Sequence, residues 1–380
     1  MNLIRFNRDS RVDFSRGLAL WWIFMDHIPD NRFSLASLRN FALCDAAEAF
    51  VFLAGYGAGL AYGRAMDRQG WLFAGADSLK RAWTLYIAHI FLFVVFSAQV
   101  SYSAAALDRA DYLDEIHLDV LADAPYRAMF EALVLKFQPA YLDILPLYVA
   151  LLAMFAVVGL PLLRRPAVLA TLSLGTYAAA RATGANFPSW TGGGWYFNPL
   201  TWQALFMLGA IASYRRPWPR RGERLLDASA VAVVLAGIAV QWLVWPYPES
   251  VLDHLPAAVA RVLVSVDKQG LHPFRLANIL ALAWLVARFV PRDAAWLRSR
   301  AAAPFILCGQ HSLPVFCSSI FLSFLGRLAM EERQGWAVQG AVNALGPLAL
   351  LGIAALAAWY REKGRQALPS PRASGNAGVT

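Results

Sequence analysis

The chain has 380 residues, of which 58% are hydrophobic and only 16% are charged. A soluble protein has about a quarter of its residues charged, so this composition excludes an ordinary soluble domain. The net charge of +9 would suit a nucleic-acid-binding protein, but the positive residues lie mainly between apolar segments. The cysteines Cys44, Cys308 and Cys317 lack metal-ligand spacing, and we expect no metal.

Repeated apolar runs of about 20 residues predict an all-α, polytopic integral membrane protein, because a helix satisfies its own backbone groups in lipid. We predict about ten transmembrane helices, at residues 12–29, 46–66, 80–102, 141–163, 166–183, 199–214, 225–244, 274–290, 303–326 and 338–360. Lys and Arg are about twice as frequent in the inner segments as in the outer ones, which places both termini in the cytoplasm. Residues 1–365 form one membrane-embedded domain in this prediction, and residues 366–380 a disordered tail.

The first predicted helix carries a cation near its inner end and an imidazole near its outer end. Arg16 and His27 are eleven residues apart, which puts them within about 20° of one face and about 16 Å apart along the axis. Asp13 lies one turn before Arg16 and can pair with it. A snorkelling arginine and an interfacial histidine are the simpler interpretation. A central charge in lipid costs about 2.5–3.5 kcal/mol, so polar residues inside the helices are also site candidates.

The second predicted helix opens with Glu48, which lies within reach of His27 if the first two helices run antiparallel. A carboxylate beside an imidazole raises its basicity and suits a general base, and Asp26 is the other acidic neighbour of His27. A role for Glu48 at the outer interface is the alternative. Three glycines spaced four apart predict a face for close helix contact: Gly55, Gly59 and Gly63.

The third predicted helix begins near Arg81, with Tyr86 and His89 following. Arg81 alone fits the excess of positive charge on the inner side, and His89 alone fits a core histidine. In the ninth helix, His311 precedes Pro314 in a polar stretch, and polar, kinked segments often line cavities.

The outer segments differ in character. Residues 104–140 are acidic and include an amphipathic stretch near 126–137, and Asp143 opens the fourth helix. Residues 184–199 carry no charge and contain Trp190 and Trp195. Such a loop is an aromatic membrane anchor or a platform on which sugar rings stack.

Arginine, ten residues and then histidine, in SRGLALWWIFMDH, resemble the opening signature of the acyltransferase-3 family of integral membrane acyltransferases. EAFVFLAGYGAGL and KRAWTLYIAHIF resemble the second and third helices of that family. YLDILPLYVALL, FNPLTWQALFMLGA and GQHSLPVFC are similar to the narrower OpgC family, the succinyltransferases of osmoregulated periplasmic glucans. The resemblance covers roughly residues 10–360. One departure is that His311 precedes Ser312, whereas general members carry a serine and then a later histidine.

The resemblance implies O-acyl transfer at the bacterial inner membrane, from cytoplasmic acyl-CoA, succinyl-CoA in the OpgC family, to hydroxyls of a periplasmic glucan. On this interpretation His27, Glu48 and Asp26 perform catalysis, and Arg16, Arg81 and Tyr86 bind coenzyme A. The residues predicted to bind substrate are His311, Trp190, Trp195 and Asp143. The expected partners are the glucan, the lipid bilayer and glucan-synthesis proteins. A transporter of a glycan or organic acid and a non-enzymatic partner in glucan synthesis are the alternatives.

Overall fold

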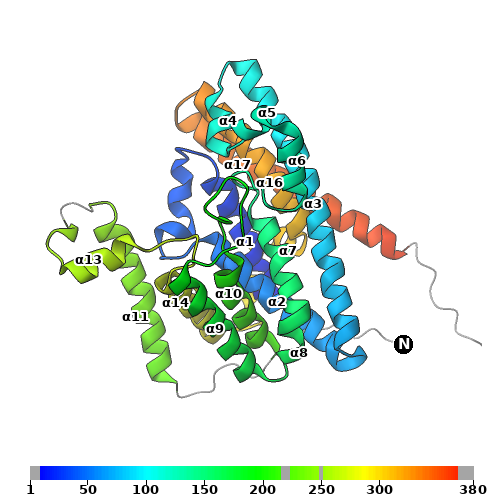
Figure 1. Cartoon of the computed structure of the whole chain (residues 1–380), viewed down its shortest axis with the longest axis vertical. Coiled ribbons are helices and arrows are strands. Elements are labelled where there is room, and N and C mark those ends of the chain that lie inside the picture. Colours follow the sequence, from blue (N-terminus) through cyan, green and yellow to red (C-terminus); the bar gives the residue numbers. More distant parts are fainter. Residues whose placement is uncertain (1–8, 215–222, 248–250, 367–380) are drawn as a thin grey trace, which may run out of the picture.

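The computed structural model describes residues 9–214, 223–247 and 251–366, and all regular structure in these residues is helical (Figure 1). Five helices are long and apolar enough to cross a membrane: Trp71–Leu107, Ile144–Leu162, Arg224–Val244, Ser312–Glu332 and Trp336–Gly364. The all-helical class and the membrane character are therefore confirmed, while ten spans and the orientation of the termini stay predictions. The predicted tail, after Gln366, lies outside the described residues.

Helices α1 (Ser10–Asp26) and α2 (Ala46–Gln69) begin at acidic caps. Asp9 accepts from the Arg11 N–H at the start of α1, and Asp45 accepts from the Ala47 N–H at the start of α2. Such caps satisfy backbone N–H groups that have no partner within the helix. The connection between α1 and α2 contains two short 3₁₀ helices, η1 (Arg32–Ala36) and η2 (Leu38–Asn40).

The acidic outer segment follows α3 (Trp71–Leu107) and forms α4 (Asp111–Ile116), α5 (Asp119–Asp123) and α6 (Pro125–Leu133), at the top of Figure 1. Buried Arg327 ties this segment to the bundle, because its guanidinium pairs with Glu115 and with Glu331. Tyr112 donates to the same Glu331 carboxylate.

The middle of the chain follows the predicted spans closely. It comprises α7 (Ile144–Met154), the π-helical turn η3 (Phe155–Gly159), α8 (Leu160–Leu162), α9 (Pro166–Thr183), α10 (Pro199–Tyr214), α11 (Arg224–Ala239) with the π-helical turn η4 (Val240–Val244), α13 (Ala257–Val264) and α14 (Pro273–Phe289). Helices α11 and α13 lie at one side of the bundle, on the left in Figure 1.

The ninth predicted span, 303–326, is not one helix. After η5 (Ala295–Arg298) the chain forms α15 (Ala303–Gln310) and α16 (Ser312–Glu332), with His311 between them. Pro314 explains the break, because it has no N–H to bond to the carbonyl of Gln310 and its ring would clash with that group. The last helix is α17 (Trp336–Gln366).

Glycines set the closest helix contacts. A Cβ added at Gly55 of α2 would lie 2.0 Å from the carbonyl oxygen of Phe206 on α10, and one at Gly59 would meet Ser213 and Ala210. The predicted small-residue face of α2 is therefore confirmed, and α10 is the helix it contacts. Gly17 of α1 and Gly309 of α15 allow a similarly close approach.

Candidate active site

His27 directly follows α1 as its C-cap, because the helix ends at Asp26, earlier than the predicted end at residue 29. Its backbone N–H bonds to the carbonyl of Ile23 at 3.1 Å, and its ring lies against Tyr141, with ring centroids 4.7 Å apart. The Nδ1 atom is buried and has no hydrogen-bond partner among the described residues. Tyr141 has a φ of 71°, a left-handed conformation that costs a bulky residue about 1–3 kcal/mol. Five other non-glycine residues among those described also have a positive φ, so this conformation bears on the site because Tyr141 contacts His27 as well. The sequence carried no signal for it.

A cavity of about 150 Å³, here called the His27 cavity, is lined by this histidine. Its charged lining residues are Asp26, Arg39, Asp45, Asp143 and Lys268. Asp26 pairs with Arg39 at 3.4 Å, and Asp143 lies just before α7. The structure thus brings together three residues predicted for the site, His27, Asp26 and Asp143.

Glu48 is placed by the sequence within reach of His27, but the structure gives it other partners. Its Oε1 accepts from Nε of Arg275 at 2.6 Å, and its Oε2 accepts from the Asp45 N–H at 3.0 Å. Glu48 is fully buried and is not among the residues that line the His27 cavity. Two requirements hold Glu48 there: the start of α2 forms a capping box with it, and buried Arg275, which is distant in the chain, needs a counterion.

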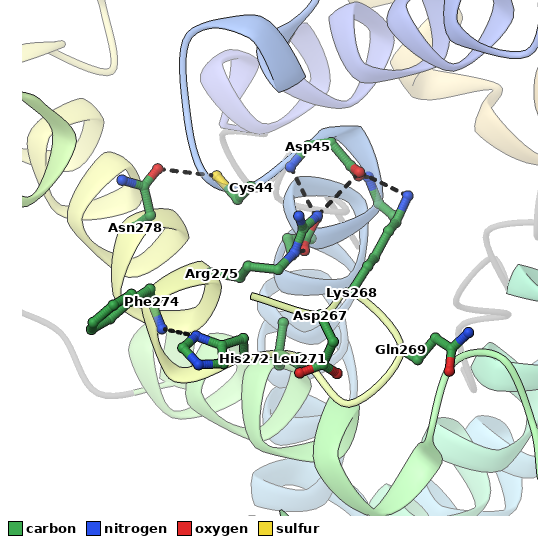
Figure 2. Close-up of polar contacts among 12 residues, drawn as sticks. Cys44, Asp45, Asp267, Lys268, Gln269, Leu271, His272, Phe274, Arg275 and Asn278 are labelled. Carbon is green, nitrogen blue, oxygen red and sulfur yellow. Dashed lines mark hydrogen bonds and ion pairs between the residues drawn. The ribbon is translucent and has the colours of Figure 1, made fainter. Parts of the chain in front are cut away.

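Figure 2 shows Lys268 and Arg275 converging on Asp45, at 2.7 and 3.2 Å from its carboxylate. Burial raises the pKa of Asp45, but the charges of Lys268 and Arg275 outweigh burial and hold it well below its usual range. Burial lowers the pKa of Lys268, but the carboxylates of Asp45 and Glu48 raise it above its usual range. Lys268 therefore stays charged beside His27 at neutral pH.

Sequence reasoning assigned no role to Lys268 or Asp45. Lys268 lies in an irregular segment between α13 and α14, where no periodic pattern points inward. Asp45 carried a readable signal, because aspartate followed three residues later by Glu48 is a capping-box pattern.

A second cavity, of about 210 Å³, contains Arg16 and Arg81 and is called the Arg16 cavity. Arg16 donates to the carbonyl of Leu53 at 3.1 Å and lies 4.0 Å from Asp13. The hydroxyl of Tyr148, which also lines this cavity, is buried and has no hydrogen-bond partner among the described residues. The cavity therefore combines two cations with a polar atom that a ligand can satisfy.

Two phenylalanines line both cavities, Phe50 on α2 and Phe316 on α16. Their rings stack with centroids 6.3 Å apart and planes 27° from parallel. This ring pair is a shared wall between the cation-bearing Arg16 cavity and the His27 cavity.

His311, Tyr86 and His89, like Glu48, lie outside both cavities. His311 has its Nε2 3.2 Å from a guanidinium nitrogen of Arg361, and it adjoins Ser312, which lines the Arg16 cavity. Tyr86 donates to the carbonyl of Leu133 at the end of α6. The structure therefore does not bring His311 beside His27, nor Tyr86 beside Arg16. His89 is buried on α3, and neither ring nitrogen has a hydrogen-bond partner among the described residues.

Trp190 and Trp195 lie in the uncharged outer loop and make contacts that hold this loop in place. Trp190 donates its backbone N–H to the carbonyl of Lys136, and its ring meets Phe137 edge-on with centroids 5.5 Å apart. Trp195 is only 7% exposed and meets Phe187 edge-on. Neither tryptophan lines the His27 cavity.

The all-helical fold, with five helices long and apolar enough to cross a membrane and two cavities that charged residues line, is that of an integral membrane protein. The family model described as OpgC protein matches residues 8–362, nearly the whole chain. The chain therefore belongs to the OpgC family, and this membership points to a glucan-modifying membrane transferase. No curated protein and no solved structure matches the chain.

Proposed function

We propose that the chain is an O-acyltransferase of the bacterial inner membrane that moves an acyl group, succinyl, from cytoplasmic acyl-CoA to hydroxyls of a periplasmic glucan. The observation that carries the proposal is the shared Phe50–Phe316 wall. On one side of this wall lies the cavity with two arginines, and on the other side lies the cavity with the histidine. Donor and acceptor can therefore approach from opposite sides and meet at this wall.

The Arg16 cavity suits the donor. Coenzyme A carries phosphates, and guanidinium groups bind phosphate oxygens through charge-assisted hydrogen bonds. Arg81 is exposed at the surface, whereas Arg16 lies deeper, with a side chain 18% exposed. The thioester would then pass Arg16 and reach Phe50 and Phe316.

The His27 cavity suits the acceptor and the reaction. An imidazole nitrogen of His27 takes the proton of a sugar hydroxyl while that oxygen attacks the thioester carbonyl carbon. The carbon–sulfur bond breaks, and the coenzyme A thiolate leaves and is protonated. General-base action of this kind contributes about 10²–10⁴-fold. Tyr141 fixes the ring, a role that the sequence assigned to a carboxylate.

The size of the His27 cavity limits what enters. Pockets that bury a drug-sized ligand have about 300–1,000 Å³, whereas this cavity has about 150 Å³. A short acyl group or the edge of one sugar ring fits, and the remainder of a glucan stays outside. Asp26 and Asp143 are placed to accept hydrogen bonds from neighbouring hydroxyls.

The orientation follows the positive charge in the loops. With ten spans and both termini in the cytoplasm, the Arg16 end of α1 faces inward and the His27 end faces the periplasm. This arrangement puts each cavity on the side where its substrate is found.

The test uses the purified full-length protein in nanodiscs with labelled succinyl-CoA and a glucan. Wild type and the exposed-histidine control His254→Ala should release one coenzyme A for each acylated hydroxyl, and His27→Ala should do so about 10²–10⁴-fold more slowly. Acylation by His27→Ala at the wild-type rate would overturn the mechanism. The same protein reconstituted in sealed vesicles tests the alternative. Movement of glucan or succinate across the vesicle membrane without release of coenzyme A would favour a transporter.

A further inference from the structure

A third cavity lies outside the proposed reaction path. Its volume is about 560 Å³, larger than either of the other two, and it shares no lining residue with them. Its walls come from α1, α2 and α14, and we call it the α14 groove. A reaction at the Phe50–Phe316 wall does not require the α14 groove.

The α14 groove is apolar along most of its length. Its apolar lining includes Leu18, Trp22, Leu53, Ile279, Leu282 and Val286. Its wall on α1 runs from Arg11 to Trp22, which is about 16 Å at 1.5 Å per residue. One leaflet of a hydrocarbon core about 30 Å thick has nearly the same depth. The groove is therefore as deep as one leaflet.

One end of the groove is charged. Asp9 is shared by two guanidinium groups, Arg11 at 2.8 Å and Arg292 at 3.4 Å, and both line the groove. Arg288 lines it as well and is neutralised by Asp227 at 3.2 Å. One carboxylate therefore faces two arginines, which leaves an excess positive charge at the mouth. The side chain of Arg292 is 44% exposed and can reach a ligand.

If both termini are cytoplasmic, as proposed above, the arginines lie at the inner-leaflet end of the groove. Arg11 lies at the start of α1, and Arg292 lies just after α14. At the same end of the groove, Trp296 packs edge-on against Phe14 with ring centroids 4.9 Å apart. Tryptophan is enriched at the membrane–water interface. A cationic mouth at the interface above an apolar slot one leaflet deep matches the shape and charge of an anionic phospholipid.

We propose that, in the orientation given under Proposed function, the α14 groove binds an anionic phospholipid of the inner leaflet, with its phosphate at Arg292 beside the Asp9–Arg11 pair and an acyl chain between α1 and α14. The bound lipid fills the space between α14 and the α1–α2 pair. It is a structural ligand and takes no part in acyl transfer.

Native mass spectrometry of the purified full-length protein with dioleoylphosphatidylglycerol, and with dioleoylphosphatidylcholine as the neutral comparison, tests this proposal. Wild type should retain one phosphatidylglycerol at least tenfold more strongly than phosphatidylcholine. Arg292→Gln should remove that preference, and its control Arg298→Gln, an exposed arginine outside the groove, should keep it.

A second pair of variants tests the apolar slot without changing charge. Ala283→Phe fills the groove and should abolish retention of phosphatidylglycerol, whereas Ala277→Phe, on an exposed position of α14, should not. Unchanged retention in both Arg292→Gln and Ala283→Phe would overturn the proposal. Equal loss with Arg298→Gln would show general charge attraction, and displacement by inorganic phosphate or coenzyme A would show a different ligand.

Discussion

The ring of His27 lies against the ring of Tyr141, with centroids 4.7 Å apart and an angle of 56° between the planes. Aromatic packing therefore positions the imidazole, while the nearby carboxylates have partners of their own. Asp26 pairs with Arg39, and Glu48 pairs with Arg275.

This contact predicts the behaviour of Tyr141 variants. Tyr141→Gly suits the left-handed backbone but removes the ring, so the imidazole loses its fixed position. We expect kcat to fall at least tenfold with little change in the KM for acyl-CoA, and Tyr141→Phe to retain most activity. Steady-state kinetics on the purified variants measures both constants. A Tyr141→Phe variant as slow as Tyr141→Gly would show that the hydroxyl matters, and the positioning account would be wrong.

The Phe50–Phe316 wall makes a second prediction. Phe316→Trp enlarges the side chain between the two cavities and should lower acyl transfer at least tenfold, while coenzyme A still binds in the Arg16 cavity. Leu325→Trp, on an exposed position of the same helix, is the matched control. Transfer assays and calorimetric titration with coenzyme A separate the two effects. Normal transfer by Phe316→Trp would place the path elsewhere.

Arg81 makes a third prediction. It is exposed, so its removal should change ligand binding without damage to the fold. The loss of one charge-assisted hydrogen bond costs about 1.5–3 kcal/mol, so Arg81→Gln should raise the KM for acyl-CoA by roughly tenfold to a hundredfold. Lys80→Gln, at the neighbouring exposed position outside the cavity, should leave the KM unchanged. Equal effects of the two variants would indicate general surface charge.

The buried pair of Glu48 and Arg275 makes a prediction about stability. Arg275→Met leaves the fully buried Glu48 carboxylate without its cation, and breaking such a pair costs about 3–5 kcal/mol. Arg39→Met, which removes a half-exposed partner of Asp26, should cost less than about 1 kcal/mol. The double variant Arg275→Met/Glu48→Leu should recover part of the loss. Thermal unfolding in detergent measures all three. No recovery in the double variant would contradict the pairing.

Several helices could be predicted from the sequence, because their ends and faces depend on residues that are close together in the chain. Helix α9 has the bounds predicted for it, since Pro166 suits the first turn of a helix and Gly184 ends it with a φ of 69°. The predicted small-residue face of α2 was also found, because glycines four apart share one side of a helix. Pro314 was recognised as a kink within one predicted span at 303–326, but the sequence did not show that the helix divides completely at His311.

The partners of the site residues were harder to predict, because they are far away in the chain. Arg275 and Glu48 are 227 positions apart in the chain, and nothing near Glu48 indicates that this arginine, and not His27, is its partner. Lys268 reaches the His27 cavity from an irregular segment, and Tyr141 does so through an unusual backbone conformation. By contrast, the eleven-residue spacing of Arg16 and His27 could be read directly, because Arg16 lies in α1 and His27 follows its last residue, and their roles stay predictions.

Mass spectrometry of periplasmic glucans from a deletion strain complemented with wild type or with His27→Ala tests most directly whether the chain uses His27 to acylate a glucan. We expect wild type to restore a mass increment that equals a succinyl group, and His27→Ala to restore little or none although the protein is present in the membrane. Equal restoration by His27→Ala would contradict the proposed role of His27. Glucans that wild type leaves unchanged would contradict the assigned acceptor.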